Sequence, residues 1–585
     1  MVCTNCGKKR KKNIRGLLEA VQNNDIKKVR NLIAAGADIE EIDICGGTAL
    51  MLAAENNCAD IAKLLIDAGA DIEKKVHYDW TALMFAAKNN CADIAKLLID
   101  AGADIEVRSS DGCTALMWAA VFNSVDVARL LIDAGANIEE KCRSWTVLIA
   151  AAINNSADVA KLLIDAGVDI QKNAHGLRAL IAAAKNNSAN VAKVLIDAGV
   201  NINERCSTGK TAIEYAIEKR SVDVTRLLLE AGFNINFFGQ SLLGLAITAK
   251  SVDIVKMLID AGVDIKTKND TSFLIDAARS NSTDVAKLLI DAGVDIEAKD
   301  NDGETALMFA AENNCTDIAK MLIDARADIE EKDNDGQTAL MRATSNNSAA
   351  IAKLLIDAGA DIEAKDNDGW TALMWAANNN STDAIKLLID DGANIEAKDN
   401  NGRTALMHAA TGADIKTKRN KGSTFFMKEV FSNSVDIAKL LIDAGADIEA
   451  KDNGGRTALM YAAIDNSLDV AKLLMDTGAD IEAKRNKGST ALMYAAIGNS
   501  LDVARLLIDA GAEIETKDNT GCTALMYAAN NNSTDVAKLL IDAGAEIETM
   551  SNNGTTALKI ATYSNSGNVI KLLTDARATI EKGEH

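Results

Sequence analysis

The sequence predicts an all-α solenoid of stacked helix–turn–helix units, and three observations lead to this prediction. Residues 298–330 form one 33-residue unit, and copies beginning at residues 331 and 364 extend the period along nearly the whole chain. Each copy holds two short segments with helical apolar patterning, joined by a polar turn. One such unit cannot bury its own apolar face, whereas a stack of neighbouring units can.

The first part of a unit predicts a β-turn finger followed by a short buried helix. In residues 300–303, Asp-Asn-Asp-Gly, the acidic and amide side chains bond their own backbone and the glycine accepts a positive φ. Thr305 is a suitable N-cap, and Ala306–Ala311 are mostly strong helix formers. Because this helix is nearly all apolar, we expect it to be buried on most sides.

The second part predicts an amphipathic helix that ends at a glycine. Asn314 can cap this helix, and Ile318 and Leu322 belong to its apolar stripe. Most copies then read Asp-Ala-Gly-Ala, where a glycine such as Gly359 or Gly445 supplies the left-handed C′ position. The Asp-Ile-Glu that follows leads into the next finger.

This pattern resembles the ankyrin repeat, a β-turn finger followed by two antiparallel helices. The family's Thr-Pro-Leu-His box appears as Thr-Ala-Leu-Met, for example in Thr371–Met374, and proline is absent from all 585 residues. The resemblance covers residues 13 to about 582. It implies about 18 stacked repeats, one of them truncated, that form a curved superhelix.

Departures from the period divide the predicted array. The first block, residues 13–410, begins with an atypical capping repeat. Thr404 and Thr424 are only 20 residues apart, so we interpret residues 411–423 as a truncated-repeat junction from which a second helix is missing. Half a repeat should kink the stack or divide it into two cooperative blocks, the second being residues 424–585 with a C-terminal cap.

Residues 1–12 follow no repeat and predict a disordered basic tail. Cys3 and Cys6 are spaced as in one half of a zinc site, but a structural zinc site needs four ligands and no second pair follows at a suitable spacing. The basic run Lys8–Lys12 has the composition of a nuclear-localisation signal or of a contact for an acidic partner. The tail is the interpretation we favour, and the zinc and targeting alternatives stay open.

Composition argues against several function classes. The net charge of −21 argues against a nucleic-acid binder and against adsorption to anionic lipid, since both need clustered Lys and Arg. No run of about 18 apolar residues is present, so no membrane-spanning helix is expected. We expect a cytoplasmic monomer.

Several of the ten cysteines follow the phases of the repeat. Cys58 and Cys91 occupy the inter-helix turn of adjacent units, where a helix-packing distance of about 10 Å is too long for a disulfide. Cys113 and Cys522 share the position before the box threonine. We interpret the cysteines as reduced, small residues of a cytosolic protein.

No motif predicts catalysis, a metal site or a cofactor. Residues 207–211, Ser-Thr-Gly-Lys-Thr, end like a phosphate-binding loop, but the earlier glycine of that motif is Glu204 here. The four histidines show no metal-ligand spacing, and no nucleophile–base group stands out. We therefore predict that the protein is not an enzyme. Chemistry in the degenerate repeats 201–282, where Phe237 and Phe238 fall in a finger, is the least favoured alternative.

The family resemblance implies that partners bind the finger tips and the first-helix face, which line the concave side. Trp80, Trp145 and Trp370 precede a box threonine, and Phe122 lies in the variable pair after Ala-Ala. Exposed tryptophan is typical of interface hot spots, so we predict one patch from Trp80, Phe122 and Trp145. Trp370 marks a second patch. The tryptophans that follow Thr-Ala-Leu-Met are interpreted as packing residues.

We therefore predict a non-catalytic scaffold that binds a protein partner through its concave face. The stacked Asp-Ile-Glu and Asp-Asn-Asp segments make the fingers acidic, which favours a basic partner. The alternative is an effector of a host-associated microbe or virus that acts on a host protein in the host cytosol or nucleus.

Limited proteolysis tests the predicted junction. We expect the first cleavage between Thr411 and Thr424, because half a repeat leaves a segment without helix partners. Mass spectrometry of the early fragments would locate the cut. Resistance equal to that of the regular repeats would contradict the predicted break.

Overall fold

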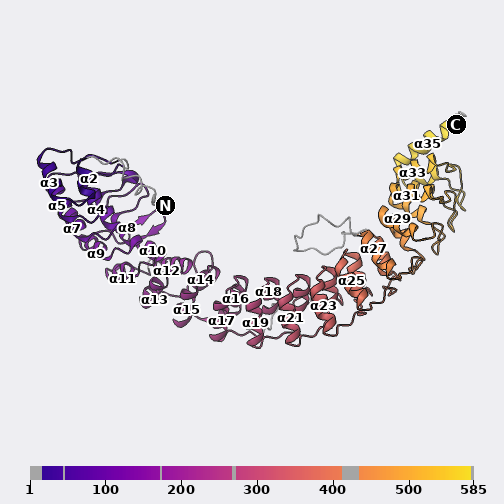
Figure 1. Ribbon diagram of the computed structural model, residues 1–585, viewed down its shortest axis with the longest axis horizontal. Coiled ribbons are helices and arrows are strands. Elements are labelled where there is room, and N and C mark those ends of the chain that lie inside the picture. The colour runs from indigo at the N-terminus through magenta and orange to yellow at the C-terminus, as the bar shows by residue number, and fades with distance from the viewer. Residues whose placement is uncertain (1–15, 44–45, 172–173, 266–271, 412–433, 582–585) are drawn as a thin grey trace. The chain divides into compact units, whose positions relative to one another are not determined.

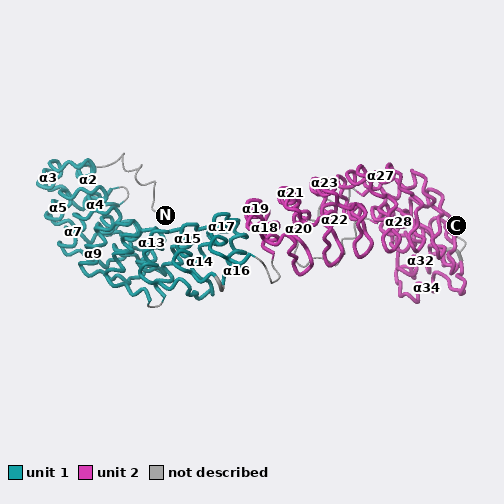
Figure 2. The backbone as a smooth tube through the Cα atoms, turned by 90° about the horizontal axis from the view of Figure 1, so that it is seen from below, with its two compact units in different colours: residues 1–265 teal, residues 266–585 magenta. Residues whose placement is uncertain are grey.

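The structure, a computed structural model, describes residues 16–43, 46–171, 174–265, 272–411 and 434–581 (Figure 1). These residues contain 34 α-helices, a 3-10 turn and one two-stranded antiparallel sheet. The chain divides into two compact units, residues 1–265 and 266–585 (Figure 2). The predicted basic tail and its alternative roles, and nearly all of the predicted junction, lie outside the described residues.

The described part of the first unit is a stack of eight helix pairs. Its helices are α2 (Gly16–Gln22), α3 (Ile26–Ala34), α4 (Ala49–Glu55), α5 (Ala59–Asp67), α6 (Ala82–Lys88), α7 (Ala92–Asp100), α8 (Ala115–Phe122), α9 (Val125–Asp133), α10 (Val147–Ile153), α11 (Ala157–Asp165), α12 (His175–Asn186), α13 (Ala189–Asp197), α14 (Ala212–Glu218), α15 (Val222–Glu230), α16 (Ile235–Thr248) and α17 (Val252–Asp260). The fingers carry the 3-10 turn η2 (His77–Asp79) and the strands β1 (Lys141–Cys142) and β2 (Trp145–Thr146).

The described part of the second unit is a stack of nine helix pairs. Its helices are α18 (Phe273–Arg279), α19 (Thr283–Asp291), α20 (Ala306–Glu312), α21 (Thr316–Asp324), α22 (Ala339–Ser345), α23 (Ala349–Asp357), α24 (Ala372–Asn378), α25 (Thr382–Asp390), α26 (Ala405–Ala410), α27 (Ser434–Asp443), α28 (Ala458–Ile464), α29 (Leu468–Asp476), α30 (Ala491–Gly498), α31 (Leu501–Asp509), α32 (Ala524–Asn531), α33 (Thr534–Asp542), α34 (Ala557–Tyr563) and α35 (Gly567–Glu581).

The helices pack as the period predicts. Within each unit, a first helix contacts its own second helix and the first helices of its neighbours, while second helices contact second helices, as α28, α29, α30 and α31 illustrate. In Figure 1 the labelled helices α3, α5, α7 and α9 accordingly form one row and α2, α4 and α8 another. First helices are buried on most sides: α4 buries six of its seven residues. These observations confirm the predicted all-α solenoid of stacked repeats.

The number of repeats is seventeen among the described residues rather than about eighteen, and no second helix is missing at the junction. Helix α26 contacts α27 as other first helices contact their partners, and α27 contacts both α25 and α29. Asn453 donates its side-chain N–H to the carbonyl of Asn400 across 53 residues, whereas Asn400 reaches its own neighbour across 33. The units predicted at Thr404 and Thr424 are therefore one repeat with a longer connection between its helices. The division into cooperative blocks here stays a prediction.

The degenerate repeats also keep their helix pairs. Phe237 and Phe238 lie inside α16 rather than in a finger. The reason is local, because this repeat lacks the Asp-Asn-x-Gly turn sequence that would stop the chain from entering the helix early.

An asparagine ladder joins the fingers of the second unit. Each of its members but the first donates Nδ2 to the backbone carbonyl of the equivalent asparagine in the preceding repeat, at 3.0–3.2 Å. The members are Asn301, Asn334, Asn367, Asn400, Asn453, Asn486, Asn519 and Asn552. The glycine two residues on must stay small: a Cβ on Gly455 would lie 2.5 Å from the Asn486 side-chain oxygen. Neighbouring fingers are therefore in direct backbone contact.

Acidic finger residues also join neighbouring repeats, in both units. Glu40 accepts the backbone N–H of Asp71 at 2.8 Å, and Glu330 accepts that of Asp361 at 2.7 Å. Lysines form a parallel series, in which Lys332 donates to the carbonyl of the next repeat's lysine at 2.8 Å. Much of the predicted acidic ladder is thus engaged in hydrogen bonds between repeats.

Asparagine caps the neighbouring repeat rather than its own. Asn314 is in the left-handed conformation, φ 54°, and the N-cap of the helix that follows is Cys315, which forms no side-chain cap bond. In the equivalent position, Asn90 accepts the backbone N–H of Asp126, in the first turn of the next repeat's second helix, at 3.1 Å. The predicted cap for its own helix is therefore wrong, and this asparagine joins repeats instead.

A disulfide joins Cys113 to Cys142, with Cα atoms 4.8 Å apart, so the prediction that the cysteines are all reduced is wrong for this pair. The prediction used the spacing of packed helices, about 10 Å. These two cysteines lie in adjacent fingers, which approach as closely as neighbouring β-strands. Among the described cysteines, Cys58, Cys91, Cys206 and Cys522 are free thiols.

Replacing Leu441 by alanine tests whether α27 completes the repeat of α26. Leu441 is fully buried, as is Leu474 at the same phase of the next repeat. We expect each substitution to lower the free energy of unfolding by about 2–5 kcal/mol, because each leaves a cavity in the stack. Urea unfolding followed by circular dichroism measures the effect, with Leu468→Ala on the surface as control. A neutral Leu441→Ala beside a costly Leu474→Ala would place α27 outside the stack.

Candidate interaction surfaces

Trp80 is buried and does not project from its finger tip. Its side chain is 7% exposed, and its ring lies 4.4 Å from the ring of Trp118 and 5.1 Å from that of Phe85. The exposure predicted for Trp80 is therefore wrong, because the ring packs against the first helix of the next repeat. Trp118, which is half-buried, packs as its phase predicts.

Phe122 and Trp145 are exposed, as their assignment to a surface requires. Phe122 ends α8, is 40% exposed and stacks on Trp118 at 6.2 Å. Trp145 is 49% exposed and pairs across the β1–β2 hairpin with Cys142. No ring contact between Phe122 and Trp145 is present in the described structure, and Trp80 lies beneath Trp118, so the predicted three-residue patch reduces to its two exposed members.

Tyr78 is an exposed finger residue that the sequence analysis missed. It is 67% exposed and adopts a positive φ of 65° in η2. Its carbonyl accepts the backbone N–H of Ser110 in the next finger at 2.8 Å. Its position at the apex of the finger, two residues before Trp80, was the available signal.

The finger that carries Trp145 is tied to the preceding one. The Cys113–Cys142 disulfide and an ion pair between Arg143 and Asp111 both join these two fingers. The antiparallel β1–β2 pairing, in which Cys142 lies opposite Trp145, holds the two sides of this finger's own turn together. Trp145 is therefore presented from a constrained hairpin.

Trp370 is half-buried in the second unit, at the centre of an aromatic group. Its ring lies 4.8 Å from that of Trp375 and 4.0 Å from that of His408. The guanidinium of Arg403 lies 5.9 Å from the Trp370 ring centre. Trp370, at the position before the box threonine, is thus partly packed against its neighbours and partly exposed.

A buried aspartate, Asp366, holds the turn of the finger that carries Trp370. Oδ1 of Asp366 accepts the backbone N–H groups of Asp368 and Trp370 at 2.9 and 2.8 Å, and its Oδ2 accepts from Nε1 of Trp375 at 3.0 Å. The equivalent aspartates of three other repeats also accept a hydrogen bond from the residue nine positions later. The pairs are Asp399 with His408, Asp452 with Tyr461, and Asp518 with Tyr527. In these four repeats the residue after Thr-Ala-Leu-Met is therefore a hydrogen-bond donor to its own finger.

Burial and hydrogen bonding set opposite pKa shifts in the Asp399–His408 pair. Burial alone would raise the pKa of Asp399, but the hydrogen bonds from His408 and the Arg403 backbone and the charge of Arg403 lower it to about 2. Burial lowers the pKa of His408 below its ordinary value, despite the hydrogen bond to Asp399. The ring is thus held neutral beside an ionised carboxylate.

The degenerate repeats bring a thiol and two hydroxyls together. Burial would raise the pKa of the Cys206 thiol, but hydrogen bonds, first from Thr208, lower it to about 7. The hydroxyls of Thr208 and Tyr215 are 2.8 Å apart. In the described part of the chain, no group of three or more His, Cys, Asp and Glu side chains is placed to hold a metal ion.

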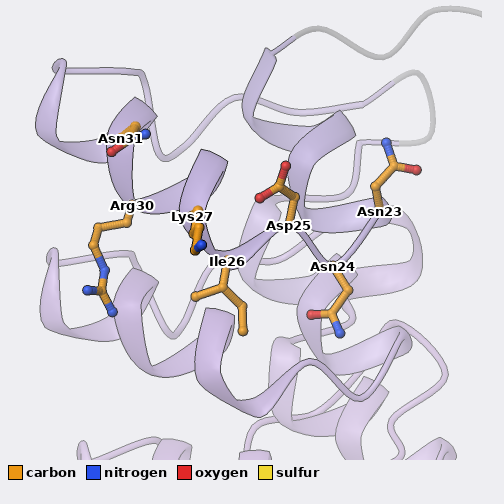
Figure 3. Close-up of a pocket in the computed structure, with 7 residues that line it drawn as sticks. All are labelled: Asn23, Asn24, Asp25, Ile26, Lys27, Arg30 and Asn31. Atoms are coloured by element: carbon orange, nitrogen blue, oxygen red, sulfur yellow. The ribbon is translucent and has the colours of Figure 1, made fainter.

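A surface hollow lies on the first helix pair (Figure 3). It is lined by Asn23, Asn24, Asp25, Ile26, Lys27, Arg30 and Asn31. Asp25 already caps α3 by accepting the backbone N–H of Lys28 at 2.9 Å. The remaining lining offers amides, two cations and one apolar side chain, which form no nucleophile–base pair.

A family model described as ankyrin repeats (3 copies) matches most of the chain. The matched segments are residues 17–109, 103–174, 168–238, 234–300, 274–366, 359–417, 426–518 and 513–583. No curated protein matches the sequence. None of the helices described is both long and apolar enough to cross a membrane.

The His408 site predicts a pH dependence of stability. The unfolded chain takes up a proton on this side chain below about pH 6.5, whereas the folded site resists it, so stability should fall by up to about 1.4 kcal/mol per pH unit there. His408→Tyr keeps a donor to Asp399, as Tyr461 does for Asp452, and should remove this dependence. Thermal unfolding at about pH 7.5 and about pH 5 measures it.

His77→Tyr, at an exposed position, is the matched control and should keep the dependence. The contribution of Asp399 falls away between about pH 3.8 and about pH 2, below the range of this measurement. An unchanged pH dependence in His408→Tyr would contradict the assignment.

Proposed function

The chain belongs to the ankyrin-repeat family, and we propose that it is a non-catalytic scaffold that binds a protein partner through its finger and first-helix face. Ankyrin repeats imply protein–protein interaction. The observation that carries the proposal is the exposure of three aromatic side chains on this face in neighbouring repeats, Tyr78, Phe122 and Trp145. Exposed aromatics of this kind are typical anchors of protein interfaces.

The rigidity of the fingers supports this proposal. Trp145 stands on a two-stranded hairpin, and the Arg143–Asp111 ion pair joins that hairpin to the preceding finger. A constrained anchor loses little conformational entropy when it binds. The same face carries Phe122, stacked on Trp118, at a helix end rather than on a mobile loop.

We propose a monomer located in the cytoplasm. Four free thiols among the described residues, two of them buried, support that location. The Cys113–Cys142 disulfide opposes that location, because a reducing cytosol keeps such pairs as thiols. Quantifying this pair by thiol labelling in freshly lysed cells is therefore a direct check of the location.

Alanine at Phe122 and Trp145 should weaken partner capture without loss of fold. The wild-type chain serves as bait in native lysate, and bound proteins are quantified by mass spectrometry. We expect the double variant to retain about one tenth or less of a specific partner, because each anchor removes contact area at a hot spot. Helical circular dichroism should be unchanged, since both side chains are exposed.

Tyr563→Ala is the matched control, an 83% exposed aromatic at the far end of the second unit's sequence. It should leave capture intact. Trp80→Ala, by contrast, should lower stability because that ring is buried. Equal capture by the wild type and the Phe122/Trp145 variant would contradict the proposed surface.

A further inference from the structure

We infer that neighbouring fingers of the second unit form a docking surface for an acidic segment of a protein partner. The surface consists of Arg403, Arg456 and Arg485, with Trp370 at one end, and is called the arginine row below. The inference rests on the proposed scaffold function and names the chemistry of a partner. It differs from the sequence-based expectation of a basic partner.

The arginines alternate with tyrosine rings from the first helices. Arg456 lies over the Tyr461 ring at 4.8 Å, and Arg485 lies 5.6 Å from the Tyr494 ring centre. Burial raises the pKa of the Tyr461 hydroxyl, and the charges of Arg456 and Arg403 oppose that rise. Burial likewise raises the pKa of the Tyr494 hydroxyl, and the charges of Arg485 and Arg456 oppose it. The three cations therefore follow one another across three successive repeats.

Two of the guanidinium groups keep hydrogen-bond donors for a ligand. Arg403 and Arg456 donate through Nε to Asp399 and Asp452, at 3.0 and 2.8 Å. Within the described residues, their Nη groups donate no hydrogen bond, and the side chains are 24% and 36% exposed. A guanidinium held at Nε presents its terminal N–H groups in a fork that matches a carboxylate.

The finger aspartates do not require these arginines. Asp518 has Cys522 at the equivalent position and still accepts two backbone N–H groups, as well as the Tyr527 hydroxyl at 2.8 Å. Asp366 has Trp370 there and keeps the same backbone bonds. Stabilising the finger turn therefore does not explain Arg403 or Arg456. Arg485 stands at the aspartate position of its own finger, where its Nε donates to the Ser489 hydroxyl at 3.3 Å.

Finger-tip charge changes along the same unit. The tip residue of the Asp-Asn-x-Gly turn is aspartate in three repeats, at positions 302, 335 and 368. In the next three repeats it is Asn401, Gly454 and Lys487. The row thus lies where the tips lose their carboxylates, in a chain whose net charge is −21. A local cationic surface on an acidic protein favours encounter with anionic side chains.

Fluorescence anisotropy of a labelled oligo-glutamate peptide with the full chain tests this inference, with oligo-lysine as the second probe. Wild type should bind oligo-glutamate more tightly than oligo-lysine, and added salt should weaken that binding. The variant R403Q/R456Q/R485Q should bind it about tenfold more weakly, since three partly exposed ion pairs are lost. The matched control K439Q/K472Q/R505Q removes the same charge from exposed second-helix positions of the same repeats and should bind as the wild type does.

A variant with lysine at all three row positions guards against misfolding, because it keeps the charges and should bind with intermediate affinity. Equal losses in the row and control variants would overturn the inference, since net charge alone would then explain binding. Preference for oligo-lysine, or tighter binding of a single-stranded oligonucleotide than of oligo-glutamate, would also overturn it. None of these results bears on capture through Phe122 and Trp145, so failure here leaves the scaffold proposal separately testable.

Discussion

The structure depends on hydrogen bonds that each finger can complete only with the next repeat. A finger exposes backbone N–H and C=O groups that its own turn does not satisfy. The asparagine ladder and the glutamate acceptors satisfy them from the neighbour, at distances between 2.7 and 3.2 Å in the bonds described above. The helices supply apolar burial, and the fingers fix the register in which that burial occurs.

The aspartate of each finger connects this register to the surface. One carboxylate oxygen holds the turn, and the other accepts from the first helix of the same repeat, as between Asp452 and Tyr461. The residue that precedes the box threonine, for example Trp370 or Arg403, is free to vary because the turn does not depend on its side chain. A constant frame therefore carries side chains of changing chemistry, which is what a recognition surface requires.

The sequence predicted the helices well because their determinants are local. Threonine caps, apolar helix segments and C′ glycines repeat in most units, and the family match agrees with the repeat they predicted. Features that depend on two repeats at once were not predictable in this way. Trp80 is buried only because Trp118 lies against it, and Cys113 meets Cys142 only because fingers stack more closely than helices. The binding role of Phe122, Trp145 and Trp370 stays a prediction.

The longer connection between α26 and α27 leaves the spacing of the neighbouring fingers unchanged. The Asn453–Asn400 bond is as long as the preceding Asn400–Asn367 bond, 3.0 Å, although 20 more residues separate its partners. Hydrogen bonds between successive fingers therefore set the spacing of the repeats. The number of residues between the two helices of one repeat does not affect it. The stretch between two helices of one repeat is therefore a natural place to insert a new segment, whereas the hydrogen bonds between fingers keep the fingers at a fixed spacing.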